Sequence, residues 1–233
     1  QVVSPYKDIF RDYGMSRLTV LKNWESDVIN ASAAKRGSKY LITVHGGLGR
    51  FETLTDDAFM LVLCHEVGHL IGGAPTVKPQ NDISSEGQAD YFSTAKCFRK
   101  VAKNNPIIIK TLDSIFHPVA REKCLKAHED KIEQEICLRS SLAQESLANT
   151  LVALNELNHT PKLDTPDPHI RTFTLFNGYP SIQCRLDTVF SASLCSKSEE
   201  ELLFMDNYHQ GVCTRNEGMS LGTRPLCWYV PRD

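Results

Sequence analysis

Two histidines and a glutamate at close spacing form the segment best suited to chemistry, His65-Glu66-Val67-Gly68-His69. In a helix, positions i and i+4 lie on one face, so both imidazoles can reach a single metal ion. Glu66 lies about 100° further round the helix, where it can hold a metal-activated water and accept its proton. The spacing predicts zinc ligation by His65 and His69, with Glu66 as general base. The alternative is a pair of surface histidines with an unrelated glutamate between them.

A catalytic zinc ion needs a third protein ligand and one open coordination position. Glu86 lies in the first turn of the next predicted helix, and a short turn between the helices would bring it opposite the histidines. Asp90 is one helical turn later on the same face, where it can accept the other N–H of His65 and fix the tautomer. Glu-x-x-x-Asp is also common on ordinary helix surfaces. We expect one Zn²⁺ per chain, held by His65, His69 and Glu86.

The sequence around the candidate zinc ligands predicts the helices and the strand that must position them. Thr55 is a good N-cap for a helix from residue 55 to about residue 70, which the glycines at 72 and 73 end. Two serines before Glu86 cap a second helix, over 86–102. The β-branched, apolar run 40–45 predicts a strand that stops at Gly46-Gly47.

The remaining patterns are mostly helical. Helical periodicity is found in three further stretches: 6–34, 107–116 and 119–157, the last as more than one helix. Three prolines mark 160–168 as a loop, and 170–233 combines a short helix with irregular, cysteine-bearing chain. The sequence predicts an α+β protein, mainly helical, with a small mixed sheet, an active-site helix and a cysteine-bearing C-terminal region.

Composition excludes several classes of function. The 233 residues carry 26 basic and 28 acidic side chains, a net charge of −2, so the basic excess of a nucleic-acid-binding protein is absent. The longest strongly apolar run covers only residues 58–64, whereas a membrane span needs about 20 residues. We expect no nucleic-acid partner, no membrane span and a monomer.

Eight cysteines are spread along the chain and none forms a Cys-x-x-Cys pair, which argues against a thiolate zinc site. Their even number predicts several disulfides and an exported protein, secreted or in the periplasm or cell envelope, with any signal peptide removed. The C-terminal four are the best candidates for pairing. The alternative is a cytoplasmic protein with eight reduced thiols.

From the strand at 40–45 to Asp90 the chain resembles the gluzincin zinc peptidases, and within them the family of HtpX and the CAAX prenyl proteases, in a small soluble form. The shared features are a strand ending in small residues, the His-Glu-x-x-His helix, and a helix with Glu and Asp one turn apart. Asn30-Ala31 is similar to the Asn-Ala pair before that family's edge strand. The resemblance implies a zincin-like metallopeptidase core over 1–160, with 161–233 completing the same domain.

A second, weaker match lies near 178–188. The family has a His-Pro pair followed, six residues after the His, by an Arg; this chain has Tyr179-Pro180 and Arg185. The resemblance implies that Tyr179, assisted by Arg185, donates a hydrogen bond to the developing oxyanion, which a tyrosine O–H can do. The alternative for Tyr179-Pro180 is an ordinary turn.

Substrate contacts are expected along the predicted strand, because an extended peptide can pair with it through backbone hydrogen bonds. The glycines after the strand would allow a close turn beside the cleft. His45 could instead be a solvated strand end, and the C-terminal His169 and His209 could approach the metal. The predicted substrate-binding residues are Asn30, Val44, His45, Gly46 and Gly47.

These features predict a zinc-dependent endopeptidase that hydrolyses a peptide or protein substrate with metal-activated water. The alternative is a catalytically weak or inactive protein of the same fold that binds a peptide or protein partner. The tyrosine at position 179 and the cysteine-rich C-terminal region motivate that alternative.

Overall fold

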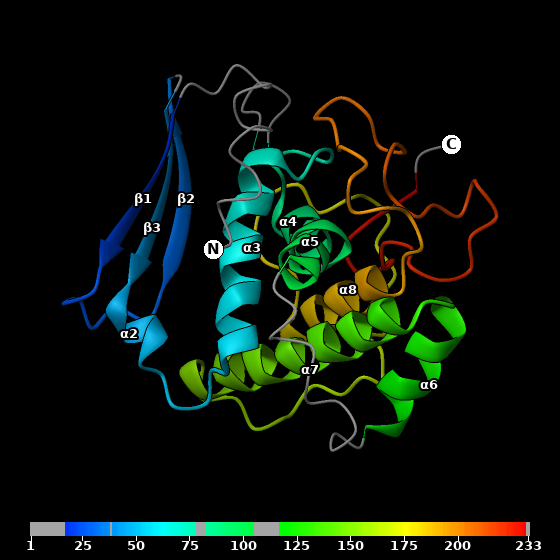
Figure 1. Ribbon diagram of the computed structural model, residues 1–233, viewed down its shortest axis with the longest axis horizontal. Coiled ribbons are helices and arrows are strands. Elements are labelled where there is room, and N and C mark those ends of the chain that lie inside the picture. Colours follow the sequence, from blue (N-terminus) through cyan, green and yellow to red (C-terminus); the bar gives the residue numbers. More distant parts are fainter. Residues whose placement is uncertain (1–16, 38, 78–82, 105–116, 232–233) are drawn as a thin grey trace.

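The computed structural model describes residues 17–37, 39–77, 83–104 and 117–231. It is an α+β structure in which a small sheet lies on one side and most of the helices on the other (Figure 1). Helix α3 (Asp56–Ile71) stands between the sheet and the later helices of the chain, so the predicted active-site helix is central to the fold.

The sheet has three strands in the order β1-β3-β2. Strand β1 (Arg17–Asn23) runs parallel to β3 (Lys39–His45), and β2 (Ala31–Arg36) runs antiparallel to β3. Alternate residues of β3, namely Tyr40, Ile42 and Val44, are buried in the main core. The strand predicted at 40–45 is therefore confirmed, and the sheet is mixed as expected.

The helix predicted over 6–34 is wrong in its described part, which contains β1 and β2. The apolar residues of β1 that pack on the core, Leu18 and Val20, follow a period of two. Strand β2 is rich in alanine, which has a low strand propensity, so its conformation depends on pairing with β3.

Helix α3 forms as its sequence signals predict. The hydroxyl of Thr55 accepts a hydrogen bond from the Ala58 N–H at 3.2 Å, and Asp56 and Asp57 occupy the first turn. The helix ends with Gly72 as C-cap. Its buried face includes Val67 and Leu70, which belong to the main core.

The helix predicted over 86–102 is present but contains an irregular turn. It consists of α4 (Glu86–Phe92), a π-helical turn η2 (Ser93–Phe98) and α5 (Arg99–Lys103). A π-helical turn inside an α-helix is often found near functional sites. Here it follows directly on the helix that carries Glu86.

Two further predictions about helices are confirmed. The stretch 119–157 contains two helices, α6 (Pro118–Ala127) and α7 (Lys131–Leu154), and the C-terminal region has one short helix, α8 (Ile182–Ser193). Helix α7 passes the lower end of α3 in the view of Figure 1, and it contacts both α3 and α8. The helix predicted over 107–116 lies outside the described residues.

All eight cysteines are paired, which confirms that the chain forms several disulfides. The C-terminal four, predicted as the best candidates for disulfides, are all bonded, and they pair with one another. The bonds are Cys64–Cys97, Cys124–Cys137, Cys184–Cys227 and Cys195–Cys213. Cys64 immediately precedes His65, and its disulfide ties α3 to η2. Within the described ranges, none of the helices has the length and apolarity needed to cross a bilayer.

Candidate metal centre

The three predicted ligands meet at one point between α3 and α4. His65 Nε2 lies 3.2 Å from Glu86 Oε2, and His69 Nε2 lies 3.6 Å from Glu86 Oε1. The two imidazole rings stand edge to face, with centroids 4.6 Å apart. One ligand atom from each of the three side chains lies within 4.8 Å of the others. The structure thus brings together the groups that sequence spacing assigned to the metal.

The second ring nitrogen of each histidine has its own partner. His65 Nδ1 lies 2.7 Å from Asp90 Oδ1, as predicted. His69 Nδ1 lies 2.9 Å from the carbonyl oxygen of Ser84. A carbonyl oxygen can only accept, so Nδ1 of His69 donates to it, and Nε2 is the nitrogen that faces Glu86. Such outer partners orient metal-ligating histidines. Sequence reasoning missed Ser84, because a backbone acceptor leaves no signal in side-chain types.

The chemistry of this cluster fits Zn²⁺. Glu86 Oε2 is buried without a partner of good hydrogen-bond geometry, and the nearest nitrogen, His65 Nε2, lies 3.2 Å away. A buried carboxylate oxygen beside imidazole nitrogens needs a cation, either a proton on an imidazole or a metal ion. Two imidazoles and one carboxylate form a usual catalytic zinc ligand set.

The electrostatics of the site also favour a positive charge. Burial lowers the pKa of His65, but the charge of Asp90 and hydrogen bonds to Asp90 and Glu86 outweigh burial and raise it to about 10. Burial raises the pKa of Glu86, but hydrogen bonds and charge from His65 and His69 bring it well below its usual range. The carboxylates around His65 therefore stabilise a positive charge in this cluster.

Arg185 forms an ion pair with Asp90. Its Nε and Nη2 each donate to one oxygen of the Asp90 carboxylate, both at 2.8 Å. Burial acts to raise the pKa of Asp90, but Arg185 and His65 outweigh it and lower the pKa to about 2. Arg185 also lines the cleft. Its ion pair with Asp90 is enough to explain its position, and the predicted assistance to an oxyanion stays a prediction.

Tyr179 lies at the mouth of the site and is 72% exposed. Its ring lies 5.8 Å from the guanidinium carbon of Arg185, and the residue lines the same cleft as Glu66 and Glu86. The charge of Glu86, followed by burial, raises the pKa of the Tyr179 hydroxyl. The hydroxyl therefore stays protonated beside the candidate metal position and can act as a donor.

A cleft of about 360 Å³ opens above the metal cluster. One wall is the stretch 29–33, which leads into and begins β2. The opposite wall comes from α7, and Glu66, which is 6% exposed, lies at the base. Of the predicted substrate-binding residues only Asn30 lines this cleft. The α7 wall was not predicted, because α7 lies far from the motif in sequence.

The prediction that 40–45 offers a free edge to a substrate is wrong. Strand β3 is central and pairs with β1 and β2, so Val44 and His45 are in the middle of the sheet. Val44 is buried in the core, and His45 Nδ1 lies 3.0 Å from the Ser26 hydroxyl. Neither residue lines the cleft.

Gly46 and Gly47 allow a close approach, but to the chain's own loop. A Cβ at Gly46 would lie 1.8 Å from the carbonyl oxygen of Trp24, and one at Gly47 would lie 2.2 Å from that of Asp27. The short helix α2 (Gly46–Gly49) can therefore pack directly under the β1–β2 loop. This packing fixes the loop that leads to Asn30, whose carbonyl accepts the His45 N–H at 3.2 Å.

The remaining histidines lie outside the metal cluster. His169 is on the surface and contacts Asp167 at 2.7 Å, and His209 lies in a second, small pocket formed by the C-terminal region. In the described part of the chain, the cluster near the motif contains only His65, His69 and Glu86.

Comparisons with protein-family models, with curated proteins and with solved structures find no significant match to this chain. The function must therefore be argued from the site itself.

Proposed function

We propose that this protein is a zinc-dependent endopeptidase of zincin-like fold, similar to the HtpX and CAAX prenyl protease family, that acts outside the cytoplasm. The observation that carries the proposal is the convergence of His65, His69 and Glu86, with both histidine Nδ1 atoms held by acceptors. The four disulfides support a location in an oxidising compartment.

The chain's own residues supply the remaining steps. When bound, Zn²⁺ supplies Lewis acidity, which lowers the pKa of water towards about 7 and polarises a peptide carbonyl. Glu66 lies on α3 beside the ligands and lines the cleft, so its carboxylate can take a proton from the attacking water and pass it to the leaving amine. Tyr179 keeps its proton and can donate a hydrogen bond to the oxyanion.

The substrate would be an extended peptide bound along β2. Among the described residues β2 pairs with β3 alone, so along the cleft-lining residues 31–33 its second edge can offer backbone donors and acceptors to a peptide. The cleft-lining residues Ala31, Ser32 and Ala33 have small side chains, which allow a peptide backbone to approach. Strand addition of this kind uses main-chain hydrogen bonds and tolerates many sequences.

The α7 wall would favour an apolar substrate side chain. Leu147, Leu151 and Leu154 lie on one face of α7 at helical spacing, and all three line the cleft. Val62 of α3 adds a fourth aliphatic side chain, one turn before the first ligand. These residues form an aliphatic surface opposite β2, without a charged group of their own.

The second candidate function is a peptide-binding protein of the same fold with little or no turnover. Tyr179 favours this second candidate, because the HtpX and CAAX prenyl protease family has a histidine at the matching position. Both candidates require the metal and the cleft, so only turnover distinguishes them.

Two measurements on the purified full chain test the proposal. Elemental mass spectrometry after exhaustive dialysis should give about one zinc per chain. Digestion of a peptide library should then give defined cleavage products, and Glu66→Gln should lower the rate by about 10²–10⁴-fold while zinc is retained. Glu122→Gln, at an exposed position on α6, is the matched control and should leave the rate unchanged.

The possible outcomes separate the candidates. A zinc ratio near zero would remove the metal site and with it both functions. A ratio near one without cleavage would favour the binding protein. Cleavage that persists in Glu66→Gln would show that Glu66 is not the general base.

A further inference from the structure

The C-terminal region contacts four of the six residues of α4 that follow the ligand Glu86. Helix α4 forms the first seven residues of the helical segment 86–103, and a helix in a protein gains most of its stability from tertiary packing. Its position must therefore come from its neighbours. The four contacts, from the residues at 87, 88, 90 and 91, are Gly87 with Trp228, Gln88 with Arg224, Asp90 with Arg185, and Tyr91 with Cys213 and Gly222.

The contact between Gly87 and Trp228 leaves no room for a side chain at position 87. A Cβ at Gly87 would lie 2.3 Å from Cδ2 of the Trp228 indole, so the ring lies directly on the helix backbone beside Glu86. Trp228 is fully buried. The preceding residue, Cys227, is bonded to Cys184 on α8, and Arg185 is the next residue of that helix. One disulfide therefore joins the segment that carries Trp228 to the helix that carries Arg185.

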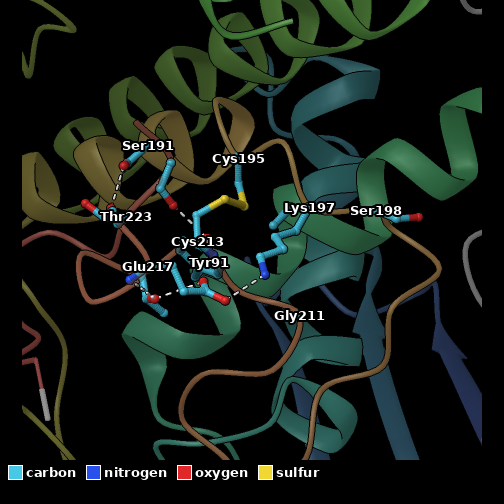
Figure 2. Close-up of a disulfide and its surroundings, with 12 residues drawn as sticks. Tyr91, Ser191, Cys195, Lys197, Ser198, Gly211, Cys213, Glu217 and Thr223 are labelled. Carbon is cyan, nitrogen blue, oxygen red and sulfur yellow. Dashed lines mark hydrogen bonds and ion pairs between the residues drawn. A yellow bond between two sulfur atoms is a disulfide. The ribbon is translucent and has the colours of Figure 1, made fainter. Parts of the chain in front are cut away.

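A second disulfide lies behind Tyr91. The Tyr91 hydroxyl donates to the carbonyl of Gly222 at 2.6 Å and accepts from the N–H of Cys213 at 3.1 Å. Cys213 is bonded to Cys195, and Gly222 packs against Cys195. Figure 2 shows Tyr91 beside this disulfide, together with the surrounding C-terminal chain.

The C-terminal chain has little regular structure to hold itself in place. Beyond α8, residues 194–231 form no helix or named strand. Disulfides that close loops of this kind restrict the unfolded chain strongly; the two here span separations of 43 and 18 residues. Without them, the segment that covers α4 would keep only non-covalent contacts, such as the hydrogen bond from the Leu175 N–H to the carbonyl of Trp228 at 2.8 Å.

We propose that the disulfide-bonded C-terminal region holds Glu86 in its ligand position, so that zinc affinity depends on formation of Cys184–Cys227 and Cys195–Cys213. This inference rests on the proposed metal site and concerns its regulation. Trp228 and Tyr91 are positioning residues, because they act on the metal through α4. The chain would then bind zinc weakly while reduced and tightly after oxidation.

The oxidation step is ordinary thiol–disulfide exchange. Two cysteine thiols and one low-molecular-weight disulfide, such as oxidised glutathione, give one protein disulfide and two low-molecular-weight thiols. A peptidase matured in this way would stay inactive until it reached an oxidising compartment, and would not act on proteins at its site of synthesis.

The test compares the zinc dissociation constants of full-length, oxidised variants by competition with a chromogenic chelator. Cys184→Ser/Cys227→Ser should bind zinc at least about tenfold more weakly than the wild type, the loss expected when outer support of a ligand is removed. Cys124→Ser/Cys137→Ser is the matched control, because this disulfide joins α6 to α7, which carry no ligand. The control pair should bind zinc like the wild type.

Variants of Trp228 test the same role of the C-terminal region if the Cys184→Ser/Cys227→Ser variant does not fold. Trp228→Leu should weaken zinc binding about tenfold and change the visible spectrum of bound Co²⁺, whereas Trp228→Phe keeps a flat ring on Gly87 and should restore most of the affinity. Trp24→Leu, at an exposed position on the sheet side, is the control. Equal affinity in the wild type and Trp228→Leu overturns this inference alone. A wild type without zinc affinity overturns the proposed function instead.

Discussion

Arg185 and Asp90, 95 residues apart in the sequence, form a two-point ion pair directly behind the metal cluster. The Arg185 guanidinium donates to both oxygens of the Asp90 carboxylate at 2.8 Å, and one of these oxygens lies 2.7 Å from His65 Nδ1. A planar guanidinium matches a carboxylate better than an ammonium group does. The pair thus fixes both the charge and the orientation of the group that holds His65.

Asp90→Asn should therefore weaken zinc binding. An amide can still lie beside His65 but carries no charge, and loss of such an outer partner costs about 10–100-fold in metal affinity. Zinc affinity by chelator competition provides the measurement. Asp206→Asn, at an exposed position, is the control and should bind zinc like the wild type. Unchanged affinity in Asp90→Asn would contradict the role given to the carboxylate.

Leu151→Ala should alter substrate preference without altering metal binding. Truncation of this side chain enlarges the cleft beside α7, so peptides with a large aromatic side chain should gain about tenfold in kcat/KM relative to peptides with leucine. A peptide-library digest of the variant measures this ratio. Leu125→Ala, at an exposed position on α6, should keep the wild-type ratio. The same ratio in Leu151→Ala would exclude α7 from substrate contact.

The local part of the site was predictable from the sequence. The i, i+4 histidines, the N-cap at Thr55 and the Glu86–Asp90 spacing all depend on helix geometry, which short-range patterns report well. The boundaries of α3 were also predictable, because its capping residues lie where the helical pattern of apolar residues begins and ends. Ser84 was missed because its contribution comes from a backbone carbonyl.

The parts that depend on tertiary contacts were less predictable. The alanine-rich strand β2 has no strand signal of its own, and its pairing with β3 makes it the edge that faces the cleft. The order of the strands places β3 in the centre, which the apolar run at 40–45 does not reveal. The leucine wall of α7 and the contact of Trp228 with Gly87 join segments far apart in sequence.

Removal of zinc should destabilise the folded chain. A ligand present at about 1,000 times its dissociation constant adds about 4 kcal/mol to stability, which for a chain of this size raises Tm by roughly 10 °C. Thermal unfolding after chelation should therefore shift downwards by that amount and recover when zinc, but not magnesium, is returned. His69→Ala should abolish the zinc-dependent shift, and His159→Ala, at an exposed position, should retain it. A wild-type Tm that is unaffected by zinc would contradict the metal site.

Ionisation of Asp187 should lower the free energy of unfolding as the pH rises from about 4 to about 6. Burial, together with the charge of Asp167, raises the pKa of this carboxyl to about 6, although it accepts hydrogen bonds from the Asp167 N–H and from Gln183. In the unfolded chain its pKa is about 3.9. As the pH rises, the unfolded state ionises first, so the folded state loses up to about 2 kcal/mol, allowing for partial exposure of the group.

Asp187→Asn should remove this pH dependence. The amide oxygen can still accept the Asp167 N–H, and no charge develops, so the variant should equal the wild type near pH 4 and exceed it in stability by up to about 2 kcal/mol at pH 7. Urea unfolding of both proteins across this range measures the difference in their free energies of unfolding. The contributions of the titrating groups that both proteins share cancel in this difference. Asp206→Asn should follow the wild-type profile. A constant difference between Asp187→Asn and the wild type at all pH values would mean that Asp187 does not titrate in this range.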